Sequence, residues 1–208
     1  MSETYVINIG RQLGSGGKEI GEKLAGRLSI KFYDKELIKC ASEESGLCQD
    51  LFERADEHTS SLFAHLNSNR LPFFNMNILP MNDYLSNEML FKIQSEVILN
   101  LAQKDNCLFV GRCADYILRR HPKCVNIFIH ANMEFRTAQL VKRLSITEEK
   151  ATALIEKTDK SRASYYNYYT DKTWGMASSY HLCIDSTLFG IDGTVDYLHE
   201  FIAKKQLL

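Results

Sequence analysis

Four glycines lie within eight residues near the start of the chain, in the stretch 10–18, which reads G-R-Q-L-G-S-G-G-K. An apolar, β-prone run precedes them, and from Lys18 onward Ile20, Leu24 and Leu28 recur at helical spacing. A glycine-rich turn between a strand and a helix can bind phosphate, because the helix presents unpaired amides and the positive end of its dipole there. Glycine also adopts positive φ at low cost and lets a phosphate approach the backbone. The stretch therefore predicts a phosphate site, and a tight turn that only packs the strand on the helix is the alternative.

The loop departs from the Walker pattern G-x-x-x-x-G-K-[ST] in either register. If Gly17-Lys18 is the glycine–lysine pair, Gln12 stands at the leading glycine and Glu19 at the Ser/Thr that would hold Mg²⁺. If Gly14-Ser15-Gly16 supplies the central glycines instead, Gly17 stands where the lysine belongs.

We choose Lys18 as the lysine that meets the donor phosphates, with Arg11 as the second choice. Ser15 would contact phosphate through its amide. Since no Ser or Thr follows the lysine, Mg²⁺ would be held largely by phosphate oxygens and water, and we predict no protein metal site.

Charged residues follow several of the predicted strands. Asp34 comes after a short strand, and Gly111-Arg112 comes directly after a buried one. Asp159 and Arg162 are three residues apart on a predicted helix, so the carboxylate can orient the guanidinium. Phosphoryl transfer needs such cations to meet the charge on the transferring group. A salt bridge to a neighbouring helix is the alternative for Arg112.

Strands and helices alternate along the chain, which predicts an α/β fold with a parallel sheet covered on both faces. We expect strands near 5–9, 28–33, 107–110, 124–129 and 180–184, and helices from Lys18 and near 35–44, 48–58, 87–103, 114–120, 134–144, 147–169 and 193–204. Residues 59–83 show no sustained period and are predicted to be a mobile or acceptor-side segment. Ligands of such folds bind at the carboxyl ends of the strands, where the glycine loop, Asp34 and Arg112 would gather.

Composition sets limits on the class of protein. The 208 residues carry a net charge of −1, with 45% hydrophobic and 25% charged residues, which favours one globular domain and argues against non-specific binding of nucleic acid. We see no run long enough to span a membrane and no signal peptide. The six cysteines have no C-x-x-C spacing and the histidines have no metal spacing, so we predict a cytoplasmic protein with reduced thiols.

With these pieces in place, the chain resembles the cytidylate kinase-like family, a branch of the nucleoside monophosphate kinases of P-loop fold. The matching stretches cover nearly the whole length. They are G-R-Q-L-G-S-G-G-K-E-I (10–20), F-Y-D-K-E-L-I (32–38), V-G-R-C-A-D-Y-I-L-R (110–119), D-K-S-R-A-S-Y-Y (159–166) and T-W-G (173–175).

The resemblance implies a P-loop NTPase-type three-layer α/β/α domain over residues 1–208, with a five-stranded parallel sheet and a helical lid at about 134–172. It implies transfer of the ATP γ-phosphoryl group to a nucleoside monophosphate, with a CMP- or dCMP-like acceptor suspected. ATP and Mg²⁺ are the implied cofactors, and the partner is a small nucleotide, with no nucleic acid or membrane. A homodimer is left open.

The resemblance also assigns roles to residues. Lys18, Arg112, Asp159 and Arg162 would be catalytic, and Arg136 stands where a donor-side lid arginine is expected. The full set expected to bind the donor nucleotide is Gly10, Arg11, Gly14, Ser15, Gly16, Gly17, Lys18, Glu19 and Arg136. The set expected to bind the acceptor is Asp34, Lys35, Arg112 and Asp115.

Two family motifs differ in this chain. The D-[ST]-G that follows the second strand of cytidylate kinases is Asp34-Lys35-Glu36 here, and the last aspartate of D-G-R-D is Cys113, with Asp115 two residues later. These positions help to read the cytosine base or the sugar in the family, so the acceptor stays open. A nucleotide-binding regulatory or adaptor module with lost catalysis is the second hypothesis.

Overall fold

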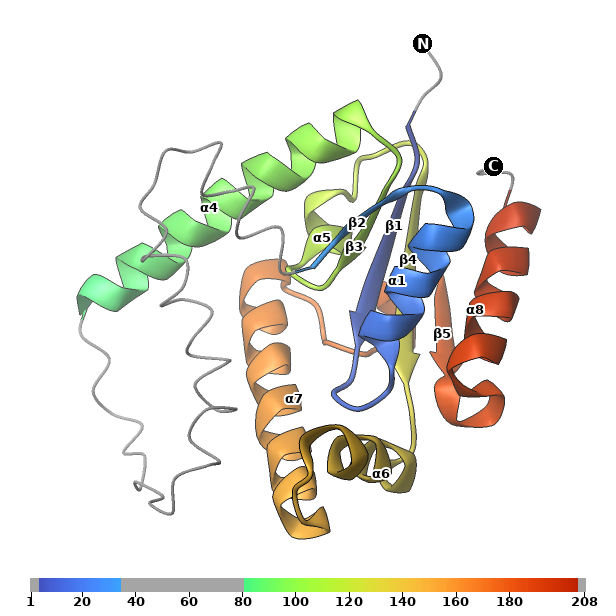
Figure 1. The fold of residues 1–208 in the computed structure, drawn as a ribbon. Coiled ribbons are helices and arrows are strands. Elements are labelled where there is room, and N and C mark those ends of the chain that lie inside the picture. Colours follow the sequence, from blue (N-terminus) through green and yellow to red (C-terminus); the bar gives the residue numbers. More distant parts are fainter. Residues whose placement is uncertain (1–3, 35–80, 206–208) are drawn as a thin grey trace. The chain divides into compact units, whose positions relative to one another are not determined.

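The described residues are built around a five-stranded parallel sheet (Figure 1). The computed structural model describes residues 4–34 and 81–205. The five strands are β1 (Val6–Arg11), β2 (Lys31–Tyr33), β3 (Cys107–Val110), β4 (Cys124–His130) and β5 (Leu182–Asp185), in the order β2-β3-β1-β4-β5. The central strand β1 pairs with β3 on one side and β4 on the other, with Val6 opposite both Cys107 and Cys124. The predicted five-stranded parallel sheet is therefore confirmed.

One face of the sheet packs against α1 (Gly17–Leu28) and α8 (Ser186–Lys204). Alternate side chains of the strands, such as Ile7, Ile9 and Ile127, are fully buried there against Ile20 and Leu24 of α1. The side chains that alternate along the strands and the apolar side chains at helical spacing on α1 thus pack together in one hydrophobic core. The glycine loop directly joins β1 to α1. Packing of α1 against the sheet therefore holds the loop at the carboxyl end of β1.

Two helices follow β4 and pack against each other, α6 (Met133–Leu144) and α7 (Glu148–Thr170). Each begins at a side-chain cap: Asn132 accepts a hydrogen bond from the Phe135 amide at 2.8 Å, and Thr147 accepts one from the Lys150 amide at 3.4 Å. In Figure 1, α6 lies beyond the arrowheads of the strands, at the carboxyl edge of the sheet. These helices fall in the range predicted to be a lid, and the lid itself stays a prediction.

Several element boundaries differ from the prediction. The second strand is Lys31–Tyr33 and does not begin at Leu28, because α1 continues to Leu28 and ends at Ser29. Ser29 adopts left-handed backbone and its amide bonds back to the carbonyls of Ala25 and Gly26, which closes the helix.

Two helices begin earlier than their patterns predict. The helix predicted at 87–103 is α4 (Met81–Lys104), so 81–83 are helical although we predicted an irregular segment up to 83. The element α8 begins at Ser186, but the non-helical Gly190 (φ 65°) divides it, so a short helical stretch precedes the kink and the helix predicted at 193–204 lies after it. Within the described residues there are also two short elements, α5 (Ala114–Ile117) and a 3-10 turn η2 (Ala177–Ser179).

The chain divides into two compact units, residues 1–34 with 99–208 and residues 35–98, and only 81–98 of the second unit belong to the described part. The helices predicted at 35–44 and 48–58, and residues 59–80 of the irregular segment, lie outside the described residues. No helix in the described ranges is both long enough and apolar enough to cross a bilayer.

Candidate active site

The glycine loop leaves the first amides of α1 open at the carboxyl edge of the sheet. Gly14 and Gly16 have φ of 82° and 76°, which glycine adopts readily. Gly16 is the N-cap of α1, and no described side chain caps that helix end. The amides of Gly17, Lys18 and Glu19 precede the first backbone bond of the helix, in which the Ile20 amide donates to the Gly16 carbonyl at 2.9 Å. This end of α1 suits an anion.

The inner side of the loop is closed by Ser15. Its hydroxyl donates to the Gln12 carbonyl at 2.9 Å, and its carbonyl accepts from the buried Ser186 hydroxyl at 2.7 Å. The Ser15 amide, predicted to meet phosphate, lies 3.4 Å from the Gln12 carbonyl. The Gln12 side chain accepts a bond from the Ala131 amide at 3.3 Å, which ties the loop to the residue after β4.

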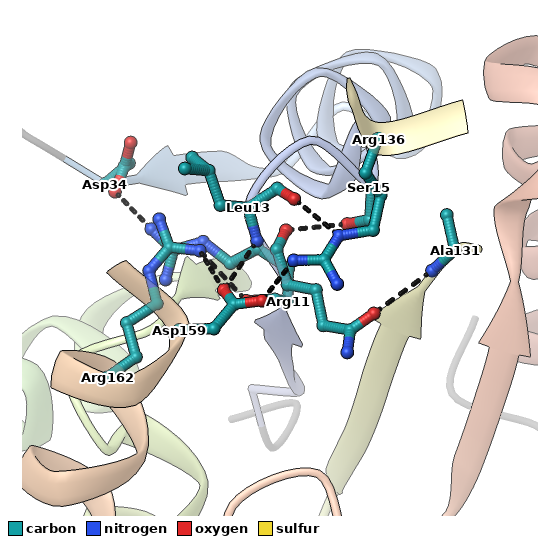
Figure 2. Close-up of polar contacts among 9 residues, drawn as sticks. Arg11, Leu13, Ser15, Asp34, Ala131, Arg136, Asp159 and Arg162 are labelled. Atoms are coloured by element: carbon teal, nitrogen blue, oxygen red, sulfur yellow. Dashed lines mark hydrogen bonds and ion pairs between the residues drawn. The ribbon is translucent and has the colours of Figure 1, made fainter. Parts of the chain in front are cut away.

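Asp159 of α7 connects the glycine loop to α6 and α7 (Figure 2). Its Oδ1 accepts a hydrogen bond from the Leu13 amide at 2.8 Å, and its Oδ2 pairs with the Arg136 guanidinium. Nε of Arg136 donates a hydrogen bond to the Leu13 carbonyl at 2.8 Å. The backbone amide and the backbone carbonyl of Leu13 are therefore both hydrogen-bonded to side chains. Burial raises the pKa of Asp159, while the Leu13 amide and the two arginines oppose that shift.

Arg162 approaches the same loop from the next turn of α7. Its Nη1 donates to the Arg11 carbonyl at 3.1 Å and lies 3.8 Å from Oδ1 of Asp159. Burial, followed by repulsion from Arg11, lowers the pKa of Arg162 to about 9, so the guanidinium remains protonated at neutral pH. The predicted i, i+3 pairing of Asp159 and Arg162 is present, although Arg136 makes the closer contact with the carboxylate.

Asp34, the residue after β2, forms ion pairs with two cationic side chains. Arg11 lies 3.5 Å from its Oδ1, and Lys18 lies 3.1 Å from its Oδ2. The Lys18 side chain is 49% exposed and that of Arg11 is 19% exposed, so Arg11 is held within the protein and Lys18 at its surface. Burial lowers the pKa of Arg11, Asp34 opposes the shift, and Arg112 adds to it, which places Arg112 in the same electrostatic field.

These side chains form one group, which we name the loop cluster: Arg11, Lys18, Asp34, Arg136, Asp159 and Arg162. It contains four cations and two carboxylates, joined by the ion pairs above. The surplus of positive charge, partly withdrawn from water, favours a ligand with several negative charges. The arginine forks match the oxygens of phosphate groups.

Other residues predicted for the site lie in different settings. Glu19 pairs with Lys23 at 3.1 Å on the surface of α1. A Cβ at Gly10 would lie 2.8 Å from the Phe128 ring, so this glycine permits close packing beneath the sheet edge. Arg112 follows β3 with left-handed backbone, φ 58°, between Gly111 and Cys113, which are also left-handed. Lys35 lies outside the described residues.

Asp115, predicted to bind the acceptor, belongs to a second group. It is buried in α5 and accepts a hydrogen bond from the Tyr166 hydroxyl at 2.6 Å. It also lines a polar cavity of about 430 Å³ between α5, β4 and the start of β5, together with Arg119, Lys172 and His181. No contact within the described residues links it to the loop cluster, so its acceptor role stays a prediction.

Comparison with known proteins identifies the family. The family model described as cytidylate kinase-like matches residues 6–188, most of the chain. The chain belongs to the cytidylate kinase-like family. No curated protein sequence matches it.

Solved structures agree with this family fold. An uncharacterized protein from Eubacterium ventriosum has 25% identity and a TM-score of 0.70, over 96% of this chain and 99% of its own. The shikimate kinase from Bacteroides thetaiotaomicron has 12% identity and a TM-score of 0.53, over 96% and 98%. The shikimate kinase from Acinetobacter baumannii, solved with shikimate, has 11% identity and a TM-score of 0.52, over 99% and 96%. The last two show likeness of fold alone.

The loop cluster is consistent with the nucleotide and Mg²⁺ that a kinase-like fold implies. Among the residues that the structure describes, no three His, Cys, Asp or Glu side chains gather as a metal site. Mg²⁺ commonly keeps several waters and takes one or two carboxylates together with substrate phosphates. Asp34 is the carboxylate at the edge of the open loop, so it is the residue that would approach an ion carried by the phosphates.

Sequence reasoning missed several residues that shape this site. Gln12 and Ser186 fasten the loop to the end of β4, through the Ala131 amide and the His130 carbonyl. Neither has a sequence signal, because each side chain acts through hydrogen bonds to backbone groups that are distant in sequence. Tyr166 was part of a tyrosine-rich helix, and nothing in that run separates it from its neighbours as the partner of Asp115.

Proposed function

We propose that this member of the cytidylate kinase-like family is an ATP- and Mg²⁺-dependent kinase that transfers the γ-phosphoryl group to a nucleoside monophosphate, with CMP or dCMP as the first acceptors to test. The observation that carries the proposal is the loop cluster. Helices that are more than a hundred residues from the glycine loop in sequence bring arginines to its backbone, and cations outnumber carboxylates there.

The proposed chemistry relies on positioning and charge neutralisation, with no covalent intermediate. The open amides at the start of α1 would bind the donor phosphates, and Lys18 or Arg11 would supply the cation beside them. Arg162, oriented by Asp159, would approach the transferring group. Bound Mg²⁺ would neutralise phosphate charge. Arg112 and Asp34 would face the acceptor.

The test is phosphoryl transfer from ATP to a panel of CMP, dCMP, UMP, AMP and GMP, measured as release of ADP. We expect turnover with at least one acceptor. Arg162→Met should lower kcat/KM by about 100-fold, the effect typical of removing one group that stabilises transition-state charge. Lys160→Met is the matched control, because Lys160 is an exposed cation on the same helix, and it should keep full activity.

Two results would contradict the proposal in different ways. If ATP binds and no monophosphate accepts phosphate, the regulatory or adaptor hypothesis replaces the kinase. If ATP does not bind, the glycine loop is not a nucleotide phosphate site.

A further inference from the structure

The Arg11 side chain occupies the space beside Gly17 in which the side chain of a P-loop lysine would start. Gly17 is the first residue of α1 and follows the left-handed Gly16, so it holds the position of the lysine in the register that centres on Gly14-Ser15-Gly16. A Cβ added at Gly17 would lie 2.5 Å from Cβ of Arg11 and 3.0 Å from its Cγ. The Arg11 side chain therefore passes directly over Gly17, and the two positions cannot both carry a side chain in this arrangement.

The head group of Arg11 is also held in place. A Cβ on Gly111 would lie 2.1 Å from Nη1 of Arg11, so the end of β3 approaches the guanidinium closely. On the other side, Nη2 faces Asp34 at 3.5 Å. The Arg11 carbonyl accepts the bond from Arg162, which links the backbone of the same residue to α7 (Figure 2).

Lys18, the neighbouring cation, lies one position further along α1. Its side chain is half exposed and reaches Asp34 from outside. Arg11 instead runs along the inner side of the loop, between the start of α1 and the ends of β2 and β3. A cation fixed by surrounding backbone loses less conformational entropy when it binds a phosphate than an exposed lysine does.

We propose that Arg11 replaces the P-loop lysine, meeting the terminal phosphates of the bound nucleoside triphosphate, and that position 17 is glycine because Arg11 occupies the space of its side chain. This inference rests on the proposed function, because it names a residue of the same phosphate site. It reverses our order of preference between Lys18 and Arg11.

The first test measures binding of ATP and AMP to the full chain by isothermal titration calorimetry. Arg11→Met should weaken ATP binding by roughly 10- to 100-fold, the range of a charge-assisted hydrogen bond, and leave AMP binding nearly unchanged. Arg11→Lys should retain part of the preference for ATP. Lys18→Met, the matched control, should change ATP affinity less than Arg11→Met does.

A double-mutant cycle tests the steric part. Gly17→Ala should weaken ATP binding and lower Tm in the wild-type background, because the new methyl group displaces Arg11. In the Arg11→Gly background the same substitution should have no such cost, since the Cβ of residue 11, which lies 2.5 Å from the position of the added methyl group, is then absent. Additive effects of the two substitutions would overturn the inference.

The two proposals fail in distinguishable ways. If the wild-type protein binds ATP and Arg11→Met binds it equally well, or if Lys18→Met is the more damaging variant, the Arg11 inference is wrong and the kinase proposal stands. If the wild-type protein binds ATP without transferring phosphate, the kinase proposal fails and the Arg11 inference is still decided by binding. Absence of ATP binding by the wild type overturns both.

Discussion

The carboxylate of Asp159 fixes the conformation of the glycine loop by bonding to the Leu13 amide and to the Arg136 side chain. It receives the Leu13 amide and the Arg136 guanidinium, and Arg136 in turn donates to the Leu13 carbonyl. The arginine side chain is 6% exposed and the aspartate side chain 14% exposed, so removing one partner leaves the other charge with little water. Asp159 therefore supports the fold and the loop conformation together.

We expect Asp159→Ala to lower the free energy of unfolding by about 3 kcal/mol, because Arg136 and the Leu13 amide lose their acceptor. Asp159→Asn should cost less, since an amide oxygen can still accept from Leu13. Urea unfolding followed by circular dichroism measures both. Asp192→Ala is the control, since that side chain is 83% exposed in its pair with Lys23 and should change stability by less than about 0.5 kcal/mol. Equal losses for Asp159→Ala and Asp192→Ala would contradict this role.

Asp115 gives a pH dependence of stability. Burial raises its pKa, and the opposing effects of the Tyr166 hydroxyl and Lys172 are smaller. A carboxyl group whose pKa is higher in the folded state contributes stability at low pH, and that contribution is lost as pH rises through the folded pKa. Asp115→Asn keeps an oxygen that can accept from Tyr166 and removes the charge.

Asp115→Asn should therefore gain stability relative to the wild type between pH 4 and pH 8. Chemical denaturation at several pH values measures the difference in the free energy of unfolding. Asp115→Ala should be less stable than Asp115→Asn at every pH, because the Tyr166 hydroxyl loses its acceptor. A stability difference between wild type and Asp115→Asn that is flat with pH, or that changes in the opposite direction, would contradict the raised pKa.

Among the elements, the turn from β1 to α1 depends on the helices that follow β4. Gly14 has φ of 82°, and a Cβ there would lie 2.7 Å from the Arg136 carbonyl oxygen. The first turn of α6 thus packs against the backbone of the glycine loop. Glycine is required at position 14 because its φ is positive and because a Cβ would collide with the Arg136 carbonyl. At Gly26 in α1, by contrast, an added Cβ would have no atom within 4 Å.

Gly14→Ala should destabilise the protein by about 2 kcal/mol or more, from left-handed strain and overpacking. The control Gly26→Ala should stabilise it by about 0.5–1 kcal/mol, since alanine is the better helix residue. Thermal unfolding followed by circular dichroism separates the two. A Gly14→Ala protein as stable as the wild type would mean that α6 does not press on the loop.

For the molecule as a whole, the net charge of −1 hides a local excess of positive charge. The loop cluster gathers four cations near the carboxyl edge of a sheet whose core is apolar. An anionic ligand that binds only the folded state stabilises it by mass action. Exposed charges in the cluster are screened by salt, so the effect should depend on ionic strength.

Tripolyphosphate at about 100 times its Kd should therefore stabilise the protein by about 2.7 kcal/mol, and adenosine alone should do much less. Differential scanning fluorimetry measures the shift in Tm at low salt and again at about 0.5 M salt, which shortens the screening length. The shift should be smaller at the higher salt concentration. Lys204→Gln is the control, because Lys204 lies in the last turn of α8. A larger Tm shift with adenosine than with tripolyphosphate would contradict a site built for phosphate.

Local patterns were sufficient for much of the architecture. The apolar runs of β3 and β4, the helical period of α1, and the glycines between β1 and α1 depend on neighbours along the chain, so they could be predicted from sequence. The same holds for the strand–helix alternation that gives a parallel sheet. The early start of α4 could not, because a helix continues through a weak pattern once it is packed. The short helical stretch of α8 before the Gly190 kink could not be predicted either, because no helical period indicates it.

The amino-acid sequence by itself determined the fold class, the family motifs and the glycine loop, since these rest on local conformation and on composition. Only the tertiary structure decided which side chains act on that loop. Arg136 and Arg162 reach it from helices distant in sequence, and Arg11 and Gly17 meet across a gap too small for two side chains. Such choices depend on the space between packed elements, which residue spacing along the chain does not encode.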